Sequence, residues 1–391
     1  MRHHLFTNLA AFLILATSAF ALPVSVSAAE RARDLGVPFD GTPGPFNAIT
    51  DVPGVLVGHT TLIEGEGAHA VRTGVTAIFP RAKLGYYPAA SFVLNGDAEF
   101  SGTIFAEEFG MLRSPIMLTG TASNGTVYTS VIKWSARKFP DSPVHMPAVA
   151  DTWDAELSDY LAFPLREEHV FAALDGAKSG PVAEGNVGGG TGMICYYFKC
   201  GIGTSSRVIA PKDGGYTVGV LVQANYGLRE DLRVAGVPVG QEVTGLSPEF
   251  PPAPTNPSPS STTKEDGSIL IIVGTNAPVS ALTLKAMARR AAMGLARNGS
   301  TANPTSGDVV LAFSTTPIVV SEKAPYLVQK QELFQYAAQP LYAATVQATE
   351  EAIINALVAG KTMTGLNGSH VHALPHDVLR EVLRRHNRLN D

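Results

Sequence analysis

The sequence predicts a layered α/β sandwich formed by a single domain, and three observations lead to this prediction. Strand-like apolar runs alternate with helical stretches along most of the 391 residues. The chain after residue 267 holds only two convincing strands, and both are nearly continuous apolar runs that need cover on both faces. With 45% hydrophobic and 16% charged residues, the chain can bury a large core. We therefore expect the two late strands to insert into a sheet supplied by the first half.

The N-terminus has the pattern of a secretory signal peptide. A short basic start, Arg2-His3-His4, precedes the apolar run LAAFLILATSAFAL, and small residues follow up to Ala28 and Ala29. The apolar run is shorter than the about 20 residues of a bilayer span, which makes a retained membrane anchor the weaker alternative. We expect residues 1–29 to be removed, leaving a secreted or periplasmic protein with no membrane attachment.

Alternating elements follow in the first half. Strands are predicted at 54–63, 73–80, 114–121, 145–153, 192–199 and 216–227, and helices at 125–137 and 167–177. Cys195 and Cys200 lie in and just after the strand predicted at 192–199. On one strand, two residues an odd number of positions apart face opposite sides, so we predict packing cysteines rather than a disulfide.

The segment 248–267 differs from everything before it. It is rich in proline, then in serine and threonine, and it is the only stretch that reads as a linker. Because the second half is not self-sufficient, we expect an exposed loop within one domain. After it, the pattern predicts a strand at 268–275, a helix at 279–297, a strand at 308–315, a helical region at 331–360 broken by Pro340, and a final helix after Pro375.

The step Gly267-Ser268 joins this loop to a buried strand, which is the arrangement that an N-terminal nucleophile requires. The Ser268 hydroxyl can attack the preceding carbonyl, and hydrolysis of the resulting ester then frees a chain that begins with serine. The new α-amine has an ordinary pKa of about 7.7–8.0, which suits a general base. Taken locally, Gly-Ser before a strand is also consistent with a simple loop end.

Other functional classes find little support. A net charge of -5 offers no basic field for nucleic acid. The chain has no Walker A loop, no His-Glu-x-x-His and no Gly-x-Ser-x-Gly, and its histidines lack metal-ligand spacing. We therefore predict no metal and no cofactor. A histidine–serine catalytic pair stays open, although no local pattern points to one; His370 and His372 lie in a glycine-flanked loop.

The chain resembles the DmpA-type self-processing aminopeptidases, a family that includes L-aminopeptidase/D-amidase/D-esterases and β-peptidyl aminopeptidases. The resemblance covers essentially the whole mature chain. It rests on RARDLGVPFDGTPGPFNAITDVPGVLVGHTT, GNVGGGTGM, GIGTSSR, NYGLREDLRVAGVPVG, DGSILIIVGTNAP, TEEAIINALVAG and TMTGLNGSHVHALP. It implies an αββα sandwich like that of N-terminal-nucleophile hydrolases, with its own connectivity. It also implies cleavage into an α chain, 30–267, and a β chain, 268–391, with several αβ heterodimers per oligomer.

The resemblance also assigns roles to individual residues. Ser268 matches the nucleophile, and Asn225 matches the asparagine whose side-chain amide donates to the oxyanion. Ser306 matches a second serine near the nucleophile. Asp308 matches an acidic position that can hold the α-amine of Ser268, although the β-peptidyl relatives carry glutamate there.

Two further residues match the substrate site of the family. Asp151 stands where an acid receives the substrate's free ammonium, again with aspartate in place of the usual glutamate, and Trp153 stands where an aromatic lines the site and can aid the oxyanion. The glycines 188–190 are expected to let the backbone approach the active centre closely, with a phosphate cradle as the rival.

The resemblance therefore implies an exported aminopeptidase that acts on short peptides, amides or esters with a free N-terminal amine. The acyl group would be a β-amino acyl or an L- or D-alanyl residue. Two alternatives stay open at this point: an acyltransferase of the ornithine-acetyltransferase type, in which threonine is the usual nucleophile, and a non-catalytic exported binding protein.

Overall fold

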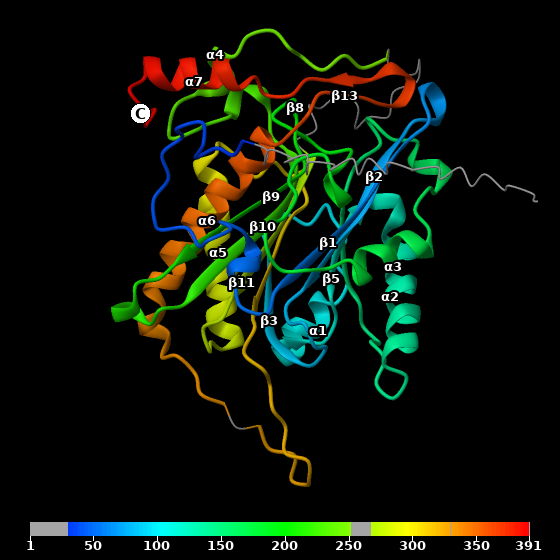
Figure 1. Cartoon of the computed structure of the whole chain (residues 1–391), viewed down its shortest axis with the longest axis vertical. Helices are drawn as coiled ribbons and strands as arrows, with labels where there is room; N and C mark the ends of the chain where they lie inside the picture. Colours follow the sequence, from blue (N-terminus) through cyan, green and yellow to red (C-terminus); the bar gives the residue numbers. More distant parts are fainter. Residues whose placement is uncertain (1–29, 252–266, 329, 391) are drawn as a thin grey trace, which may run out of the picture.

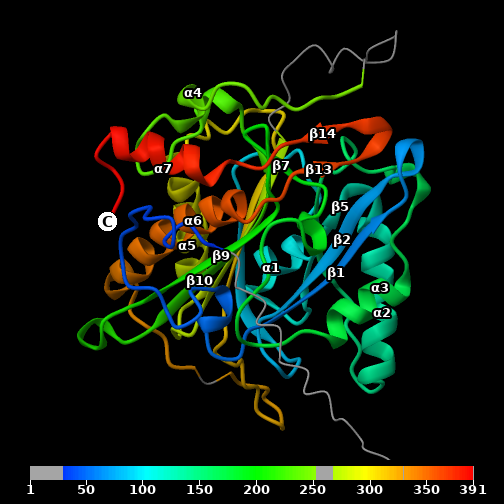
Figure 2. The same ribbon diagram turned by 45° about the horizontal axis from the view of Figure 1, so that its top comes forward.

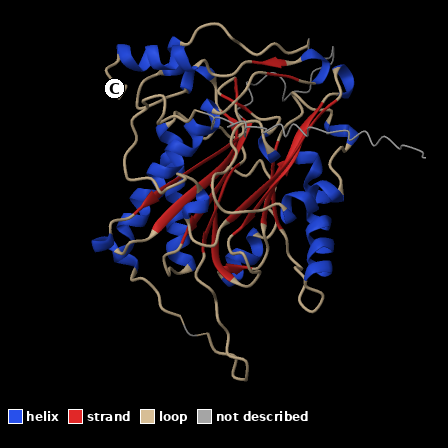
Figure 3. Cartoon of the chain, viewed as in Figure 1, coloured by secondary structure: helices blue, strands red, loops and turns tan. Residues whose placement is uncertain are grey.

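The computed structural model describes residues 30–251, 267–328 and 330–390. The signal peptide predicted at 1–29 and most of the loop predicted at 248–267 lie outside the described residues. Two sheets face each other and helices cover their outer faces, as Figures 1 and 3 show. The predicted layered α/β sandwich is therefore confirmed, with four layers in the order αββα.

The smaller sheet has four strands in the order β1-β2-β5-β6. Their bounds are β1 Leu56–Glu64, β2 Val71–Phe79, β5 Ile116–Gly120 and β6 Ala148–Thr152. Helix α2, Asn124–Lys138, connects the parallel strands β5 and β6, and it lies beside α3, Glu167–Asp175, on the outer face (Figure 2). Val127, Val131 and Trp134 recur at helical spacing and are buried under α2, which explains its docking.

The larger sheet has six strands in the order β4-β3-β12-β11-β10-β9. Their bounds are β4 Met111–Leu112, β3 Tyr87–Val93, β12 Asp308–Ser314, β11 Gly267–Thr275, β10 Thr217–Tyr226 and β9 Ile202–Val208. The two strands of the second half, β11 and β12, are parallel neighbours in the middle of this sheet. Their predicted insertion into a sheet supplied by the first half is confirmed.

Two long helices cover the outer face of the larger sheet (Figures 1 and 2). Helix α5, Ala281–Arg297, begins where the Ser280 hydroxyl accepts a hydrogen bond from the Thr283 N–H, and it crosses from β11 to β12. Helix α6 is Gln339–Val358, and it starts rather than breaks at Pro340, because a first-turn residue needs no N–H partner. The predicted interruption of a helix at Pro340 was therefore wrong.

Hydrophobic side chains form separate layers that match this architecture. The inner faces of the two sheets meet in a core that includes Ile116, Leu118, Leu270, Ile272 and Leu311. A second core lies under α5 and α6, and a third lies under α2 and α3. Every residue of β10 is buried, since this strand is covered on both faces.

The stretch 192–199 is a hairpin and not the single strand that we predicted. Strand β7, Ile194–Cys195, pairs antiparallel with β8, Phe198–Lys199. Tyr196 and Tyr197 form the turn with φ values of 50° and 59°. Because the chain reverses between the cysteines, Cys195 and Cys200 come to lie 5.6 Å apart at their Cα atoms and form a disulfide. The prediction of two unpaired packing cysteines was therefore wrong.

The remaining elements are short. They are α1 Thr103–Phe109, α4 Val239–Glu242, β13 Met363–Thr364, β14 His370–Val371 and α7 His376–Arg385. The sequence predicts α7, but not α1, β3 or β9. Among the helices of the described residues, none has the length and apolarity of a membrane span.

Candidate active site

The predicted nucleophile lies directly opposite the predicted oxyanion donor. Strands β10 and β11 are antiparallel, and Asn225 pairs with Ser268 in their register. Directly opposed residues project from the same face of a sheet, which brings the two side chains together. The preceding residue, Gly267, has φ 64°, and a Cβ there would lie 1.9 Å from the Asn225 carbonyl oxygen. The backbone before Ser268 therefore requires glycine.

The start of β12 supplies the other groups around Ser268. The Gly307 N–H donates to Ser268 Oγ at 3.1 Å, and Ser306 Oγ donates to Asp308 Oδ1 at 2.6 Å. Asp308 pairs with Ile269 in the parallel register of β11 and β12. The structure thus brings Ser268, Asn225, Ser306 and Asp308 to one end of three neighbouring strands.

Sequence reasoning missed a residue that contacts Asp308. Asn95 Nδ2 donates to Asp308 Oδ2 at 3.1 Å and to the Asn303 carbonyl at 3.0 Å. Burial raises the pKa of Asp308, and hydrogen bonds from Ser306, Asn95 and the Ile269 backbone act in the opposite direction. Asn95 follows β3, and because β3 was not predicted, nothing in the sequence located Asn95 beside β12.

Asn225 is held in one orientation. Its Oδ1 accepts a hydrogen bond from the Ile194 N–H at 2.8 Å, so its NH₂ group is turned away from that contact. Both Asn225 and Ser268 are 8% exposed. A fixed neutral donor beside a nucleophile is what oxyanion stabilisation requires, since no reorganisation is needed when charge develops.

A cavity of about 770 Å³ opens beside these residues. The described residues that line it are Gly96, Asp97, Ala98, Glu99, Thr121, Asp151, Thr152, Trp153, Glu156, Ile194, Tyr197, Asn225, Tyr226, Gly227, Phe250, Gly267, Ser268 and Thr305. Four of these carry a carboxylate and none carries a lysine, arginine or histidine side chain. The described lining therefore favours a cationic ligand.

Asp151 is the most deeply placed of these acids, at 4% exposure. Asn124 Nδ2 donates to its Oδ1 at 2.6 Å. Burial is the main cause that raises the Asp151 pKa, and the nearby Glu99 carboxylate adds to it, while Thr121 and Asn124 act against it. A cationic partner stabilises the charged form of a buried carboxylate, so Asp151 is well placed to bind the ammonium group of a substrate.

Trp153 lines the same cavity and is 38% exposed. Its ring packs against Tyr160 with centroids 4.9 Å apart. Its indole N–H donates to Glu156 Oε1 at 3.1 Å. In this arrangement Trp153 forms a wall of the site, and its donor is directed to Glu156 rather than toward an oxyanion.

The glycines 188–190 do not line the cavity. They pass between the two sheets, where a Cβ on Gly188 would lie 2.3 Å from Thr76 Oγ1 and one on Gly189 would lie 2.0 Å from Gln223 Oε1. They therefore allow close packing behind the site. This packing role corrects the expectation that these glycines let the backbone approach the active centre directly.

The described part of the chain shows neither a histidine nor a cluster of metal ligands at this site. In the ranges 30–251, 267–328 and 330–390, no group of three or more histidine, cysteine, aspartate or glutamate residues could hold a metal ion. His370 binds Thr364 Oγ1 through Nδ1, and its ring lies against His372; neither histidine lines the cavity. Among the described residues, the lining of this cavity includes no histidine.

Comparisons with known proteins agree with this geometry. The model of peptidase family S58 matches residues 47–371. The chain is 48% identical over 382 residues to a β-peptidyl aminopeptidase BapA from Sphingosinicella xenopeptidilytica, covering 93% of this chain and 94% of the relative.

Two solved structures are similar to the whole fold. A β-aminopeptidase from a Burkholderia species has a TM-score of 0.81 and 43% identity, and the match covers 91% of this chain and 99% of the other. The L-aminopeptidase D-Ala-esterase/amidase from Ochrobactrum anthropi has a TM-score of 0.82 and 39% identity, with 92% and 99% covered. That enzyme is described as a prototype for the serine aminopeptidases and a new variant of the Ntn-hydrolase fold.

Fold, site and comparisons agree, and they favour the aminopeptidase among the alternatives that the sequence leaves open. The chain belongs to peptidase family S58, and it is a serine aminopeptidase with the layered fold of the N-terminal-nucleophile hydrolases.

Proposed function

We propose that this chain is an exported, self-processing aminopeptidase that cleaves its own Gly267-Ser268 bond and then releases N-terminal residues through an acyl-enzyme on Ser268. The observation that carries the proposal is the opposition of Ser268 and Asn225 across β10 and β11, at the wall of an acid-lined cavity. Gly267, in a conformation that favours glycine, precedes the nucleophile.

In the self-cleavage step, Ser268 Oγ attacks the carbonyl carbon of Gly267. The bond between that carbon and the Ser268 nitrogen breaks, and the hydroxyl proton passes to the nitrogen, which becomes the new α-amine. Water then hydrolyses the ester, giving a carboxyl group at Gly267 and a free hydroxyl at Ser268. The Gly307 N–H, which donates to Ser268 Oγ, helps to hold that oxygen in place.

In turnover, the α-amine of Ser268 accepts the proton of its own hydroxyl as Oγ attacks the substrate carbonyl. Asn225 donates to the oxygen on which negative charge develops, a contribution typically worth about 10²–10³ in rate. Asp308, joined to Ser306, provides the negative charge that holds the α-amine. The leaving amine takes the proton, and water hydrolyses the acyl-serine ester.

The substrate's free N-terminal ammonium pairs with Asp151. An ammonium taken from water without a partner carries a heavy desolvation penalty, so this pairing explains release from the amino end only. The proposed substrates are short peptides, amides or esters that carry a β-amino acyl or an L- or D-alanyl group. The names of the relatives support this range, since they include both β-peptidyl and L-amino acid/D-alanyl enzymes.

Export and assembly into oligomers of αβ heterodimers are part of the proposal. The Cys195–Cys200 disulfide supports an oxidising compartment, where such bonds persist. The arm that extends from the body between β12 and α6 (Figure 1) exposes Val319, Tyr326, Leu327 and Phe334. Exposed apolar side chains on a projecting arm favour contact with another subunit.

Release of p-nitroaniline from β-alanyl, L-alanyl and D-alanyl anilides tests the proposal. We expect turnover by the wild-type protein on at least one anilide and none by Ser268→Ala. In Asp151→Asn, which keeps the size of the side chain, we expect kcat/KM to fall by about 100-fold, mainly through KM, because the ammonium loses its counter-charge. Full activity of Ser268→Ala would exclude the proposed mechanism.

An ester of acetylated alanine serves as the matched substrate for the second variant. It carries no ammonium, so its hydrolysis should differ little between the wild-type protein and Asp151→Asn. Equal losses on the charged and the acetylated substrates would show that Asp151 supports the site structurally rather than by receiving the ammonium.

A further inference from the structure

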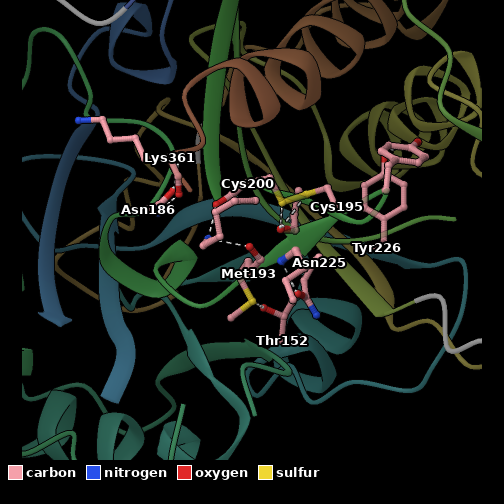
Figure 4. The surroundings of a disulfide bond; sticks show 12 residues. Thr152, Asn186, Met193, Cys195, Cys200, Asn225, Tyr226 and Lys361 are labelled. Atoms are coloured by element: carbon pink, nitrogen blue, oxygen red, sulfur yellow. Dashed lines mark hydrogen bonds between the residues drawn. A yellow bond between two sulfur atoms is a disulfide. The ribbon is translucent and has the colours of Figure 1, made fainter. Parts of the chain in front are cut away.

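The hairpin β7–β8 is closed by the Cys195–Cys200 disulfide, which Figure 4 shows together with Asn225. Ile194 and Tyr197 from this hairpin line the cavity. Cys195 and Cys200 are fully buried behind it. The hairpin therefore borders the cavity on one side and carries the buried disulfide on the other.

The hairpin also sets the orientation of Asn225. The Ile194 N–H donates to Asn225 Oδ1 at 2.8 Å, and Ile194 is the neighbour of Cys195. The two sulfurs lie 3.2 and 3.1 Å from the carbonyl oxygen of Ala224, the residue just before Asn225. The disulfide thus lies against the backbone of the strand that carries Asn225, and one residue away from the donor that orients its amide.

The length and the turn sequence of this hairpin do little to stabilise it. Each strand has two residues, and both turn positions, Tyr196 and Tyr197, have positive φ. Two-residue turns of this kind favour asparagine or glycine, because other side chains are strained in the left-handed region. The covalent bond between Cys195 and Cys200 opposes opening of such a turn.

Ile194 pairs with Lys199 across the hairpin, and side-chain hydrogen bonds brace the hairpin on either side of Ile194. Arg229 donates to the carbonyls of Tyr196 and Tyr197 at 2.8 and 2.7 Å. The buried Lys199 Nζ donates to the carbonyls of Met193 and Cys200, both at 2.7 Å. These bonds hold the turn and the base of the hairpin, whereas the disulfide ties the residue after Ile194 to the opposite side.

We propose that the Cys195–Cys200 disulfide is a positioning element for catalysis: it holds the Ile194 N–H against Asn225 Oδ1, so that the Asn225 NH₂ group faces the reacting carbonyl. The two cysteines and Ile194 are positioning residues, since none of them is proposed to touch the reacting atoms. The inference rests on the oxyanion role proposed for Asn225.

Loss of the disulfide should lower kcat and leave KM nearly unchanged. Asn225 acts on charge that develops in the transition state, so a misdirected amide weakens the transition state and not substrate binding. Misplacement of a catalytic group by about 1 Å can cost about 10²-fold in rate. Because Asn225 remains present and only its orientation is released, we expect a loss of about tenfold.

The test compares disulfide loss with and without Asn225. Mature protein is treated with a phosphine reductant, and the loss of the disulfide is checked by alkylation and mass. Cys195→Ala/Cys200→Ala is measured in parallel, and both treatments are repeated in the Asn225→Ala background. Each rate is divided by the fraction of chains that are cleaved at the Gly267-Ser268 bond, so that differences in self-cleavage do not affect the comparison. The matched control is the double alanine variant with reductant, which should not respond, because the chain has only two cysteines.

We expect kcat to fall about tenfold on disulfide loss in the Asn225-containing protein and not to fall further in Asn225→Ala. Equal losses of kcat in both backgrounds would overturn the inference, because the disulfide would then act on the general structure. An unchanged kcat in both backgrounds would also overturn it. If Asn225→Ala itself keeps wild-type kcat, the oxyanion role in the proposed function fails, and with it the inference. If Asn225→Ala lowers kcat and loss of the disulfide then lowers it further by the same factor as in the Asn225-containing protein, the oxyanion role stands and only the inference about the disulfide is overturned.

Discussion

Asp308 shows how single contacts decide the chemistry of the site. The carboxylate is nearly fully buried, at 2% exposure, and burial alone favours its neutral form. Donors from Ser306 and Asn95 favour the ionised form. In the proposed mechanism Asp308 must be negative to hold the α-amine, so these two donors help to keep it charged as the pH falls.

The first prediction concerns Asn95→Ala. Removal of the amide takes away one contribution that lowers the Asp308 pKa, so this pKa rises further above its ordinary value. The ionised form of Asp308 is lost as pH falls through its pKa, so the step of the kcat/KM profile that reports Asp308 should move to higher pH. We also expect kcat at neutral pH to fall by up to about tenfold, since positioned acid–base groups contribute about 10²–10⁴ and only one support is lost.

Asn186→Ala is the control for this experiment. Asn186 also bonds through its amide to backbone, with Nδ2 donating to the Lys361 carbonyl, but it does not contact Asp308. Its pH–rate profile should coincide with that of the wild type. An unshifted acidic limb in Asn95→Ala would show that Asn95 does not set the charge of Asp308.

Sequence reasoning located the residues that carry recognisable chemistry and missed those that support them. Ser268, Asn225, Ser306 and Asp308 are near one another because they lie on or next to the adjacent strands β10, β11 and β12. Asn95 and the Ile194 N–H act through contacts between segments far apart in the chain, and no local pattern reports such contacts. The disulfide was missed for a local reason, because a turn at Tyr196-Tyr197 lacks the residues that signal a hairpin.

At the scale of elements, the beginning of β11 sets the position of Ser268, the proposed nucleophile. Gly267 is the first residue of the strand and pairs with Tyr226, yet its φ of 64° departs from extended backbone. The chain therefore bends at the bond that is proposed to break. A buried strand supplies a rigid base for Ser268, while the residue before it takes a conformation that side chains disfavour.

The second prediction is that Gly267→Ala blocks or greatly slows self-cleavage. A Cβ at this position would lie 1.9 Å from the Asn225 carbonyl oxygen, so either the start of β11 or the Asn225 backbone must move. The measurement is the time course of the two cleavage products on a denaturing gel.

Gly245→Ala separates backbone strain from this collision. Gly245 has φ 76°, close to that of Gly267, but a Cβ there meets nothing within 4 Å. Both variants carry the strain of a side chain in the left-handed region, about 1–2 kcal/mol, and only Gly267→Ala adds the collision. Cleavage of Gly267→Ala at the rate of Gly245→Ala would contradict the steric explanation.

At the scale of the whole molecule, the proposed cleavage leaves two chains that must stay together. Strands β11 and β12 lie between β3 and β10, so the second chain contributes the middle of a sheet whose edges belong to the first. Arg33 and Arg207 from the first chain both pair with Glu351 of α6, at 2.8 and 2.7 Å. Burial alone would raise the Glu351 pKa, but these arginines and Asn47 lower it below its usual value.

The third prediction is that Glu351→Gln destabilises the protein by about 3–5 kcal/mol. Arg207 is 2% exposed, and without its carboxylate partner it becomes a buried cation without compensation. Urea unfolding measures the loss. Glu167→Gln is the control, because Glu167 pairs with Lys133 and Arg137 at the surface, where ion pairs contribute little. Similar small losses in both variants would show that the Glu351 cluster does not hold the two chains together.

The layered architecture was predictable because its cause is visible in the sequence. Two apolar strands without partners of their own need neighbouring strands and cover on both faces, which the first half of the chain supplies. Strands β3 and β9 were not predicted, and β9, with the sequence IGTSSRV, contains glycine and serines in place of an apolar run. Their burial comes from the neighbouring sheet and helices, which only the folded chain provides.

The central claim is that a new N-terminus at Ser268 makes the enzyme active, and intact mass spectrometry of active protein tests it most directly. We predict two chains, one ending at Gly267 and one spanning Ser268 to Asp391, with activity proportional to the cleaved fraction. A single chain that is uncut between Gly267 and Ser268 and yet fully active would contradict the claim.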